Sequence, residues 1–159
     1  MVKLIMGLKG CGKTKRMIEL VKSAVAEEHG DVVCLEKGPK LTYDIPHKAR
    51  LISITQYNFG SYEFLKGFIS GLNASNYDVS HVFIDSLQKI VDTEREHELE
   101  EFLNWLHRLS EKEGIKFTLT YSAEPNLASP GIQKFLKEIK RLRAASCRPR
   151  FFHTNEGLQ

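Results

Sequence analysis

The sequence contains no run of apolar residues long enough to cross a membrane, since a spanning helix needs about 18 of them. The opening residues Met-Val-Lys-Leu-Ile-Met lead directly into a glycine-rich segment, so we expect no secretory signal peptide. An excess of one charge is also absent. The 23 Lys and Arg residues against 20 Asp and Glu residues leave a net charge of +3, which gives no argument for a nucleic-acid or membrane-surface partner.

Cysteine is scarce as well. The chain has 3 cysteines, at positions 11, 34 and 147, and no CxxC pair. This spacing supports neither a disulfide framework nor a zinc knot, so we expect a reduced, cytoplasmic protein. The length of 159 residues, with 42% hydrophobic and 27% charged residues, fits one globular domain with a core of its own.

Apolar runs and helical periods alternate along the chain. We expect strands at residues 2–6, 32–35, 51–54, 81–85 and 117–121. A helix is expected to begin at Lys13, a second at the cap residue Ser61, and a third at a capping box formed by Thr93 and Glu96. Gly114 is expected to end the third helix, and a last one should start at residues 129–130, Ser-Pro.

This alternation predicts a mostly parallel sheet with helices on both faces. One connection departs from the pattern, because residues 37–48 are polar, contain two prolines and show no helical period. Since parallel neighbours need a crossover, we expect the third strand to be antiparallel or not adjacent to the second.

The segment GLKGCGKT, residues 7–14, lies between the first strand and the first helix. It matches GxxxxGK[ST], the phosphate-binding loop or Walker A motif, at every fixed position. The glycines let backbone N–H groups point inward at phosphate oxygens, and the helix N-terminus adds its positive end. Lys13 is expected to reach the β- and γ-phosphates, and the Thr14 hydroxyl to bind Mg²⁺. The predicted nucleotide-binding residues are Gly7, Leu8, Lys9, Gly10, Cys11, Gly12, Lys13, Thr14 and Lys15.

The apolar strand HVFID ends in Asp85, the pattern of a Walker B strand. Its carboxylate is expected to hold Mg²⁺ opposite Thr14, so Lys13 and Asp85 are the predicted catalytic residues.

Ser86 follows Asp85 at the position where many fast P-loop ATPases carry a glutamate that activates the attacking water. A residue that positions this water could come from another strand. Thr120 or Ser122, at the end of the fifth strand, could sense the γ-phosphate, and Glu124 could approach from the loop beyond. Alternatively, all three are ordinary loop residues. Residues 43–44, Tyr-Asp, could likewise contact a base or a sugar, or belong to a solvated loop.

With GLKGCGKT and HVFIDS as anchors and EKGPKLTYDI as a softer third, the chain resembles P-loop NTPases from about residue 1 to residue 143. More narrowly, it resembles small bacterial ATP-binding proteins described as similar to the pilus-retraction ATPases of twitching motility. The order of elements is also similar to that of thymidine kinases. That family carries a catalytic glutamate after the Walker B aspartate and a zinc-bound lasso, and this chain has Ser86 and no CxxC pair there.

Together these features predict a three-layer α/β P-loop domain of the RecA-like kind over residues 1–143, with a mobile tail at 144–159. The expected function is Mg-ATP binding with slow or partner-stimulated hydrolysis, in which a protein partner completes the catalytic site. A small-molecule or nucleoside kinase and a non-hydrolysing nucleotide-binding module are the alternatives. The sequence leaves the base preference and the oligomeric state open.

Overall fold

Five parallel strands form one sheet, in the order β1-β5-β4-β2-β3, in the computed structural model, which describes residues 1–39 and 41–136. The strands are β1 (Val2–Gly7), β2 (Asp31–Glu36), β3 (Arg50–Ser53), β4 (Val79–Ile84) and β5 (Lys116–Ser122). The helices are α1 (Lys13–Glu27), α2 (Tyr62–Ser75), α3 (Leu87–Ile90), α4 (Glu96–Glu113) and α5 (Pro130–Gln133), with the 3₁₀ turns η1 (Ile54–Gln56) and η2 (Pro125–Leu127). The predicted α/β class with a five-stranded sheet is confirmed.

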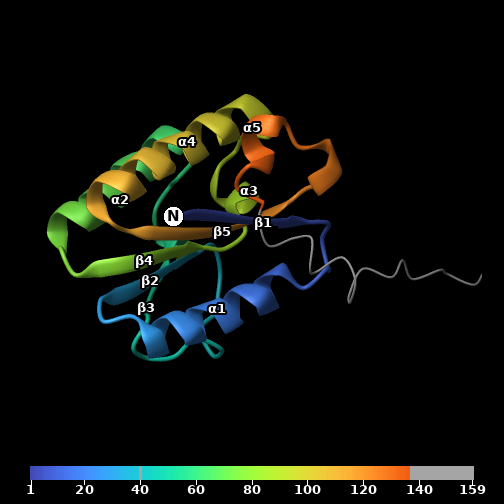
Figure 1. Cartoon of the computed structure of the whole chain (residues 1–159). Coiled ribbons are helices and arrows are strands. Elements are labelled where there is room, and N and C mark those ends of the chain that lie inside the picture. The colour runs from blue at the N-terminus through green and yellow to red at the C-terminus, as the bar shows by residue number, and fades with distance from the viewer. Residues whose placement is uncertain (40, 137–159) are drawn as a thin grey trace, which may run out of the picture.

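Helices cover both faces of this sheet (Figure 1). Helix α1 lies on one face, and α2, α4 and α5 lie on the other. Side chains alternate accordingly along the strands: on β2, Val32 and Cys34 pack with α1, whereas Val33 and Leu35 join the larger core under α2 and α4. Both faces of the strands are therefore buried, as expected for a parallel sheet.

The prediction for the third strand was wrong. Strand β3 is adjacent and parallel to β2, with Cys34 opposite Leu51 and Leu35 opposite Ile52. In its described residues, 37–39 and 41–49, the connection has turns and no helix; it buries Leu41 completely and packs Ala49 against the α1-side core. Compact turns that bury apolar side chains can thus cover the sheet as a crossover helix would.

Three of the predicted helix ends can be compared directly with the structure. The Ser61 hydroxyl accepts a hydrogen bond from the Phe64 N–H at 3.2 Å, which confirms the predicted cap of α2. Gly114 ends α4 in the left-handed conformation, with φ at 72°. The capping box was wrong: α4 begins after Arg95, whose N–H donates to the Thr93 hydroxyl at 3.3 Å.

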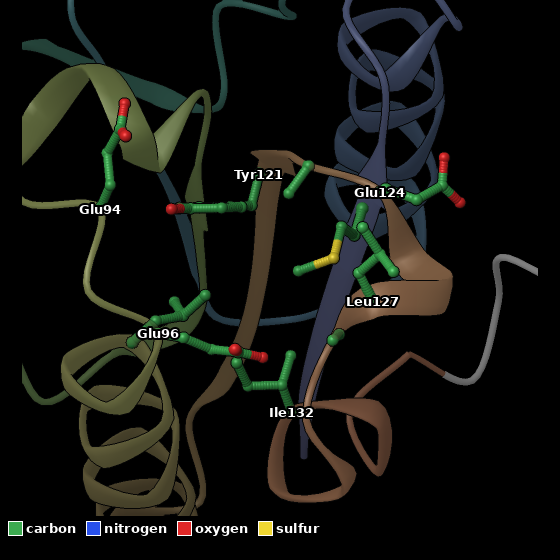
Figure 2. A pocket seen from close by; sticks show the side chains of 10 residues that line it. Glu94, Glu96, Tyr121, Glu124, Leu127 and Ile132 are labelled. Atoms are coloured by element: carbon green, nitrogen blue, oxygen red, sulfur yellow. The ribbon is translucent and has the colours of Figure 1, made fainter.

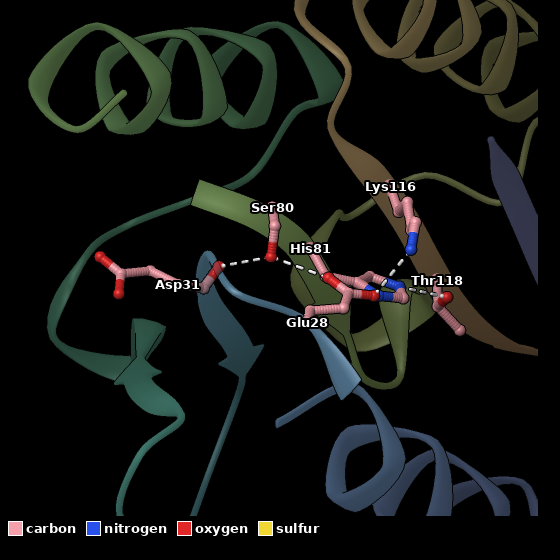
Figure 3. A network of polar contacts seen from close by, with 6 residues as sticks. All are labelled: Glu28, Asp31, Ser80, His81, Lys116 and Thr118. Atoms are coloured by element: carbon pink, nitrogen blue, oxygen red, sulfur yellow. Dashed lines mark hydrogen bonds and ion pairs between the residues drawn. The ribbon is translucent and has the colours of Figure 1, made fainter. Parts of the chain in front are cut away.

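A buried polar network ties the end of α1 to the sheet, at the edge opposite the glycine-rich loop (Figure 3). His81 Nδ1 lies 3.0 Å from the Glu28 carboxylate, and His81 Nε2 lies 2.9 Å from the Thr118 hydroxyl. Lys116 and Ser80 also donate to Glu28, at 3.0 and 2.7 Å. Burial lowers the pKa of His81 to about 4, so the ring is neutral at pH 7, donating to Glu28 and accepting from Thr118.

Part of the sequence-based prediction lies beyond the described residues. The domain end at residue 143, the tail at 144–159 and the last positions of the C-terminal helix are among residues 137–159. Within residues 1–39 and 41–136, no helix combines the length and the apolar character needed to cross a bilayer.

Candidate functional site

The loop between β1 and α1 takes a curled conformation that only glycine adopts easily. Gly10 and Gly12 have φ angles of 85° and 90°, in the left-handed region where other residues are strained. Gly7 is required for a different reason: a Cβ atom on it would lie 2.5 Å from the Cys11 sulfur. The loop therefore depends on each of these glycines for its shape.

Lys13, the first residue of α1, bends back over this loop. Its ammonium donates to the Leu8 carbonyl at 2.9 Å and lies 3.9 Å from the Cys11 sulfur. The residue is only 9% exposed, so a positive charge is largely buried against neutral acceptors. Such a charge gains strongly from an anionic partner.

Thr14 and Asp85 meet across the sheet edge as the two motifs predict. The Thr14 hydroxyl lies 3.3 and 3.4 Å from the two Asp85 carboxylate oxygens. Asp85 is 3% exposed, and its N–H donates to the Leu35 carbonyl at 3.0 Å, which continues the β4–β2 ladder. One hydroxyl and one carboxylate thus face the loop from two elements distant in sequence.

The Thr120 side chain holds the Asp85 carboxylate in place. Its hydroxyl donates to Asp85 Oδ1 at 2.7 Å and accepts from the Ser86 N–H, also at 2.7 Å. Thr120 is 1% exposed and does not line the cavity at the loop, so it fixes the carboxylate and is not placed to contact a phosphate itself.

A cavity of about 520 Å³ lies in front of the loop. Its lining residues come from the loop, α1, α3 and the end of β5: Lys9, Gly10, Gly12, Lys13, Thr14, Lys15, Ser86, Gln88, Lys89 and Ser122. Four of them are lysines, which makes the cavity electropositive. Of the other predicted binding residues, Gly7, Leu8 and Cys11 shape the loop without lining the cavity.

Gln88 was missed by the sequence analysis. Its side-chain amide donates to the Ser122 hydroxyl at 3.1 Å, and its carbonyl oxygen accepts from the Ser122 N–H at 3.1 Å. This pair holds Gln88 at the cavity wall. The activating glutamate of fast P-loop ATPases directly follows the Walker B aspartate. Gln88 lies further along the chain from Asp85, so this pattern gave no indication of it.

Ser86 has the one positive φ of a non-glycine residue in the described part of the chain, at 53°. A left-handed serine costs roughly 1–2 kcal/mol, and such strain is concentrated at functional sites. Here the strain turns the chain from β4 into α3, which brings Gln88 and Lys89 to the cavity.

Three other candidates lie away from the cavity. Glu124 lines a separate cavity on the other side of β5. Tyr43 is 94% exposed, and neither Tyr43 nor Asp44 lines the cavity at the loop. Their proposed contacts with a base or a sugar therefore stay untested predictions.

Mg²⁺ fits the oxygen donors of this site. In the described part of the chain, no group of three or more His, Cys, Asp and Glu side chains is placed to hold a metal ion by itself. Mg²⁺ commonly takes only one or two protein oxygens and completes its shell with phosphates and water. Thr14 and Asp85 offer that number of ligands.

Comparisons with known proteins give evidence of fold. No protein-family model matches the sequence, and no curated protein matches it either. Among solved structures, a KaiC-like protein from the hyperthermophilic archaeon Pyrococcus horikoshii OT3 superposes with a TM-score of 0.53 at 21% identity. The chain has a RecA-like P-loop fold. The match covers 84% of this chain and 66% of that one, so the chain spans slightly less than two thirds of its structural neighbour.

This neighbour confirms the α/β P-loop fold class, and at 21% identity it is evidence of the fold alone. It gives no support to the narrower resemblance to pilus-retraction ATPases. What the site binds has to be argued from its own residues.

Proposed function

We propose that this chain binds Mg-ATP at residues 7–15 and hydrolyses it slowly, or at a rate that a protein partner sets. The observation that carries the proposal is the placement of the Thr14 hydroxyl 3.3 Å from the buried Asp85 carboxylate, beside a cavity lined by four lysines. A polyanion with a divalent cation matches both halves of this arrangement.

The loop supplies the phosphate contacts. Gly10, Gly12, Lys13 and Thr14, where the loop leads into α1, line the cavity, and backbone N–H groups at a helix N-terminus favour anions. Lys13 exchanges its bond to the neutral Leu8 carbonyl for β- and γ-phosphate oxygens. Because the ammonium is already folded back over the loop, little side-chain entropy is lost on binding.

Thr14 and Asp85 hold the metal ion. Thr120 keeps the Asp85 carboxylate in one orientation, so the ligand set is organised before the ion arrives. The bound ion contributes charge neutralisation at the phosphate oxygens.

Hydrolysis joins a water oxygen to the γ-phosphorus while the bond to the β–γ bridging oxygen breaks, which gives ADP and phosphate. With Ser86 in the place of an activating glutamate, the side chain in the cavity best suited to orient this water is the Gln88 amide. A glutamine orients the attacking water in several P-loop enzymes. Turnover is therefore slow, and a partner that adds a further charged group would speed it.

The test combines binding with product analysis. A fluorescent ATP analogue is titrated with and without Mg²⁺, and labelled ATP is incubated with and without a panel of nucleosides, followed by thin-layer separation. Lys13→Ala should weaken binding by about 10- to 100-fold, the value of a charged hydrogen bond. Asp85→Asn should remove the gain in affinity that Mg²⁺ gives. Lys22→Ala, on the exposed side of α1, is the matched control.

The products separate the alternatives. Release of phosphate alone supports an ATPase, a phosphorylated nucleoside supports a kinase, and binding without products supports a non-hydrolysing module. Affinity that is unchanged in Lys13→Ala would refute the assignment of the loop itself.

A further inference from the structure

A second cavity, of about 220 Å³, lies on the other face of β5 from the phosphate loop (Figure 2). It is enclosed by the ends of β1 and β5, the start of α4, and the residues from η2 to α5. Its described lining residues are Met6, Glu94, Glu96, Leu99, Tyr121, Ala123, Glu124, Leu127, Ala128 and Ile132. It shares no lining residue with the cavity at the loop, and nothing in the proposed ATP chemistry uses it.

The interior of this cavity is apolar and its mouth is acidic. Met6, Leu99 and Ile132 are buried, whereas Glu94 and Glu96 are exposed. Among the described lining residues none is basic. An occupant would therefore meet hydrocarbon inside and negative charge at the entrance.

Tyr121 contributes a polar hydroxyl to the wall of this apolar cavity. The residue is 8% exposed, and its hydroxyl points across the cavity between Glu94 and Glu96. Within the described residues, this hydroxyl has no hydrogen-bond partner. This hydroxyl is therefore free to bond a small ligand or water in the cavity.

The carboxylates act on this hydroxyl. Burial raises the pKa of Tyr121, and the charges of Glu94 and Glu96 raise it further. Glu96 is also held in place, because it accepts a hydrogen bond from the Ser129 N–H at 2.5 Å. The negative potential is therefore felt inside the cavity as well as at its mouth.

We propose that this cavity binds a small organic cation, with a compact apolar body against Met6, Leu99 and Ile132 and an ammonium group between Glu94, Glu96 and the Tyr121 hydroxyl. The volume is below the roughly 300–1,000 Å³ of sites for drug-sized molecules, so the ligand is a small amine. The site is separate from the proposed ATP site, although the two are near each other along β5: Tyr121 and Ala123 face this cavity and Ser122 faces the other.

The experiment uses 2-phenylethylammonium as the probe, with 2-phenylethanol and 3-phenylpropanoate as its neutral and anionic counterparts. Binding to the full chain, without nucleotide, is followed at millimolar concentrations by backbone amide shifts and by saturation transfer. The amine should bind at the Tyr121 side of β5 and about tenfold more tightly than either counterpart. Equal binding of all three probes, no binding, or shifts located elsewhere would overturn the proposal.

Variants test the named groups. Glu94→Gln combined with Glu96→Gln should weaken amine binding about three- to tenfold, and glutamine keeps an acceptor for the Ser129 N–H. Tyr121→Phe should weaken it by a similar factor. Glu111→Gln, an exposed residue at the far end of α4, is the control. Unchanged affinity in both cavity variants would refute the proposal, and loss of folding in either leaves the three-probe comparison on the natural chain decisive.

Two further measurements distinguish this amine site from the proposed ATP site and from a docking site for a protein. Lys13→Ala should leave amine binding unchanged, so the amine site can be present even if no nucleotide binds. Nα-acetyl-lysine amide should bind no more tightly than 2-phenylethylammonium. Tighter binding of this lysine derivative would replace the small-molecule ligand by a lysine side chain of a partner protein.

Discussion

Replacing Thr120 by valine removes the hydroxyl that supports Asp85 while keeping the shape of the side chain. The hydroxyl takes part in two short hydrogen bonds, one to the Asp85 carboxylate and one from the Ser86 N–H. Thr120 and Asp85 are 1% and 3% exposed, so water does not readily replace what is lost. Thr120→Val therefore creates no cavity and leaves two buried polar groups short of a partner.

The magnitude follows from these two losses. A hydrogen bond to a charged group contributes about 1.5–3 kcal/mol, and an unsatisfied buried N–H costs about 1–3 kcal/mol. Asp85 keeps its contacts with Thr14 and Ser86, and such terms are not fully additive. We expect the free energy of unfolding to fall by about 2–4 kcal/mol.

Urea unfolding followed by circular dichroism measures this change. Thr120→Ser is the matched control, since it keeps the hydroxyl and loses one buried methyl group, at a cost of about 1 kcal/mol. Thr120→Val should also lose most of the gain in ATP affinity from Mg²⁺ while binding ATP normally without the ion. If the valine variant is as stable as the serine variant, the Thr120 hydroxyl does not stabilise Asp85.

Three further predictions concern the His81 network at the C-terminal end of α1, the glycine-rich loop, and Gln88 at the wall of the cavity in front of that loop. Because His81 has a pKa of about 4 when folded and about 6.5 when unfolded, only the unfolded chain takes up its proton between these values. Stability should therefore fall by about 2–3 kcal/mol as the pH drops from about 6.5 to 4.5, and urea titrations should show a smaller fall in His81→Gln. Gly7→Ala should weaken ATP binding because the added Cβ at position 7 would collide with the Cys11 sulfur. Adding Cys11→Ala should restore the affinity, since the Cys11 Cβ is 3.9 Å from that position. Failure of this rescue would refute the steric cause. Gln88→Ala should lower kcat for ATP by about 10- to 100-fold with little change in KM, measured by phosphate release, and an unchanged kcat would remove Gln88 from catalysis.

The parts of the fold that the sequence predicted correctly are specified by neighbouring residues. GLKGCGKT needs only a strand before it and a helix after it, and Asp85 is recognisable because it ends an apolar strand. The same holds for the Ser61 cap, where a hydroxyl bonds an N–H three positions ahead. In each case the physical cause lies within a few residues, so the pattern is visible in one dimension.

Two of the misses involve contacts that no local pattern shows. Because residues 37–48 show no helical period, the third strand was expected to be antiparallel or not adjacent, but Leu41 is completely buried there and its N–H donates to the Glu36 carboxylate at 3.0 Å. Gln88 reaches the cavity only because Ser86 turns the chain and Ser122 holds the amide. None of these partners is adjacent in sequence, which is why local patterns could not find them.

Strand β5 explains how one element can serve the fold and the candidate site together. The hydroxyls at 118, 120 and 122 lie on one face of the strand, because side chains alternate with a period of two. Each bonds a different polar side chain of β4, the turn after it or α3, in the pairs Thr118 with His81, Thr120 with Asp85, and Ser122 with Gln88. A slip of β5 by one residue would turn all three hydroxyls to the opposite face and remove a hydrogen bond from each of the three partners. The position of β5 beside β4 is therefore fixed by polar contacts as well as by apolar packing, and the same contacts orient the groups proposed to hold the metal ion and the attacking water.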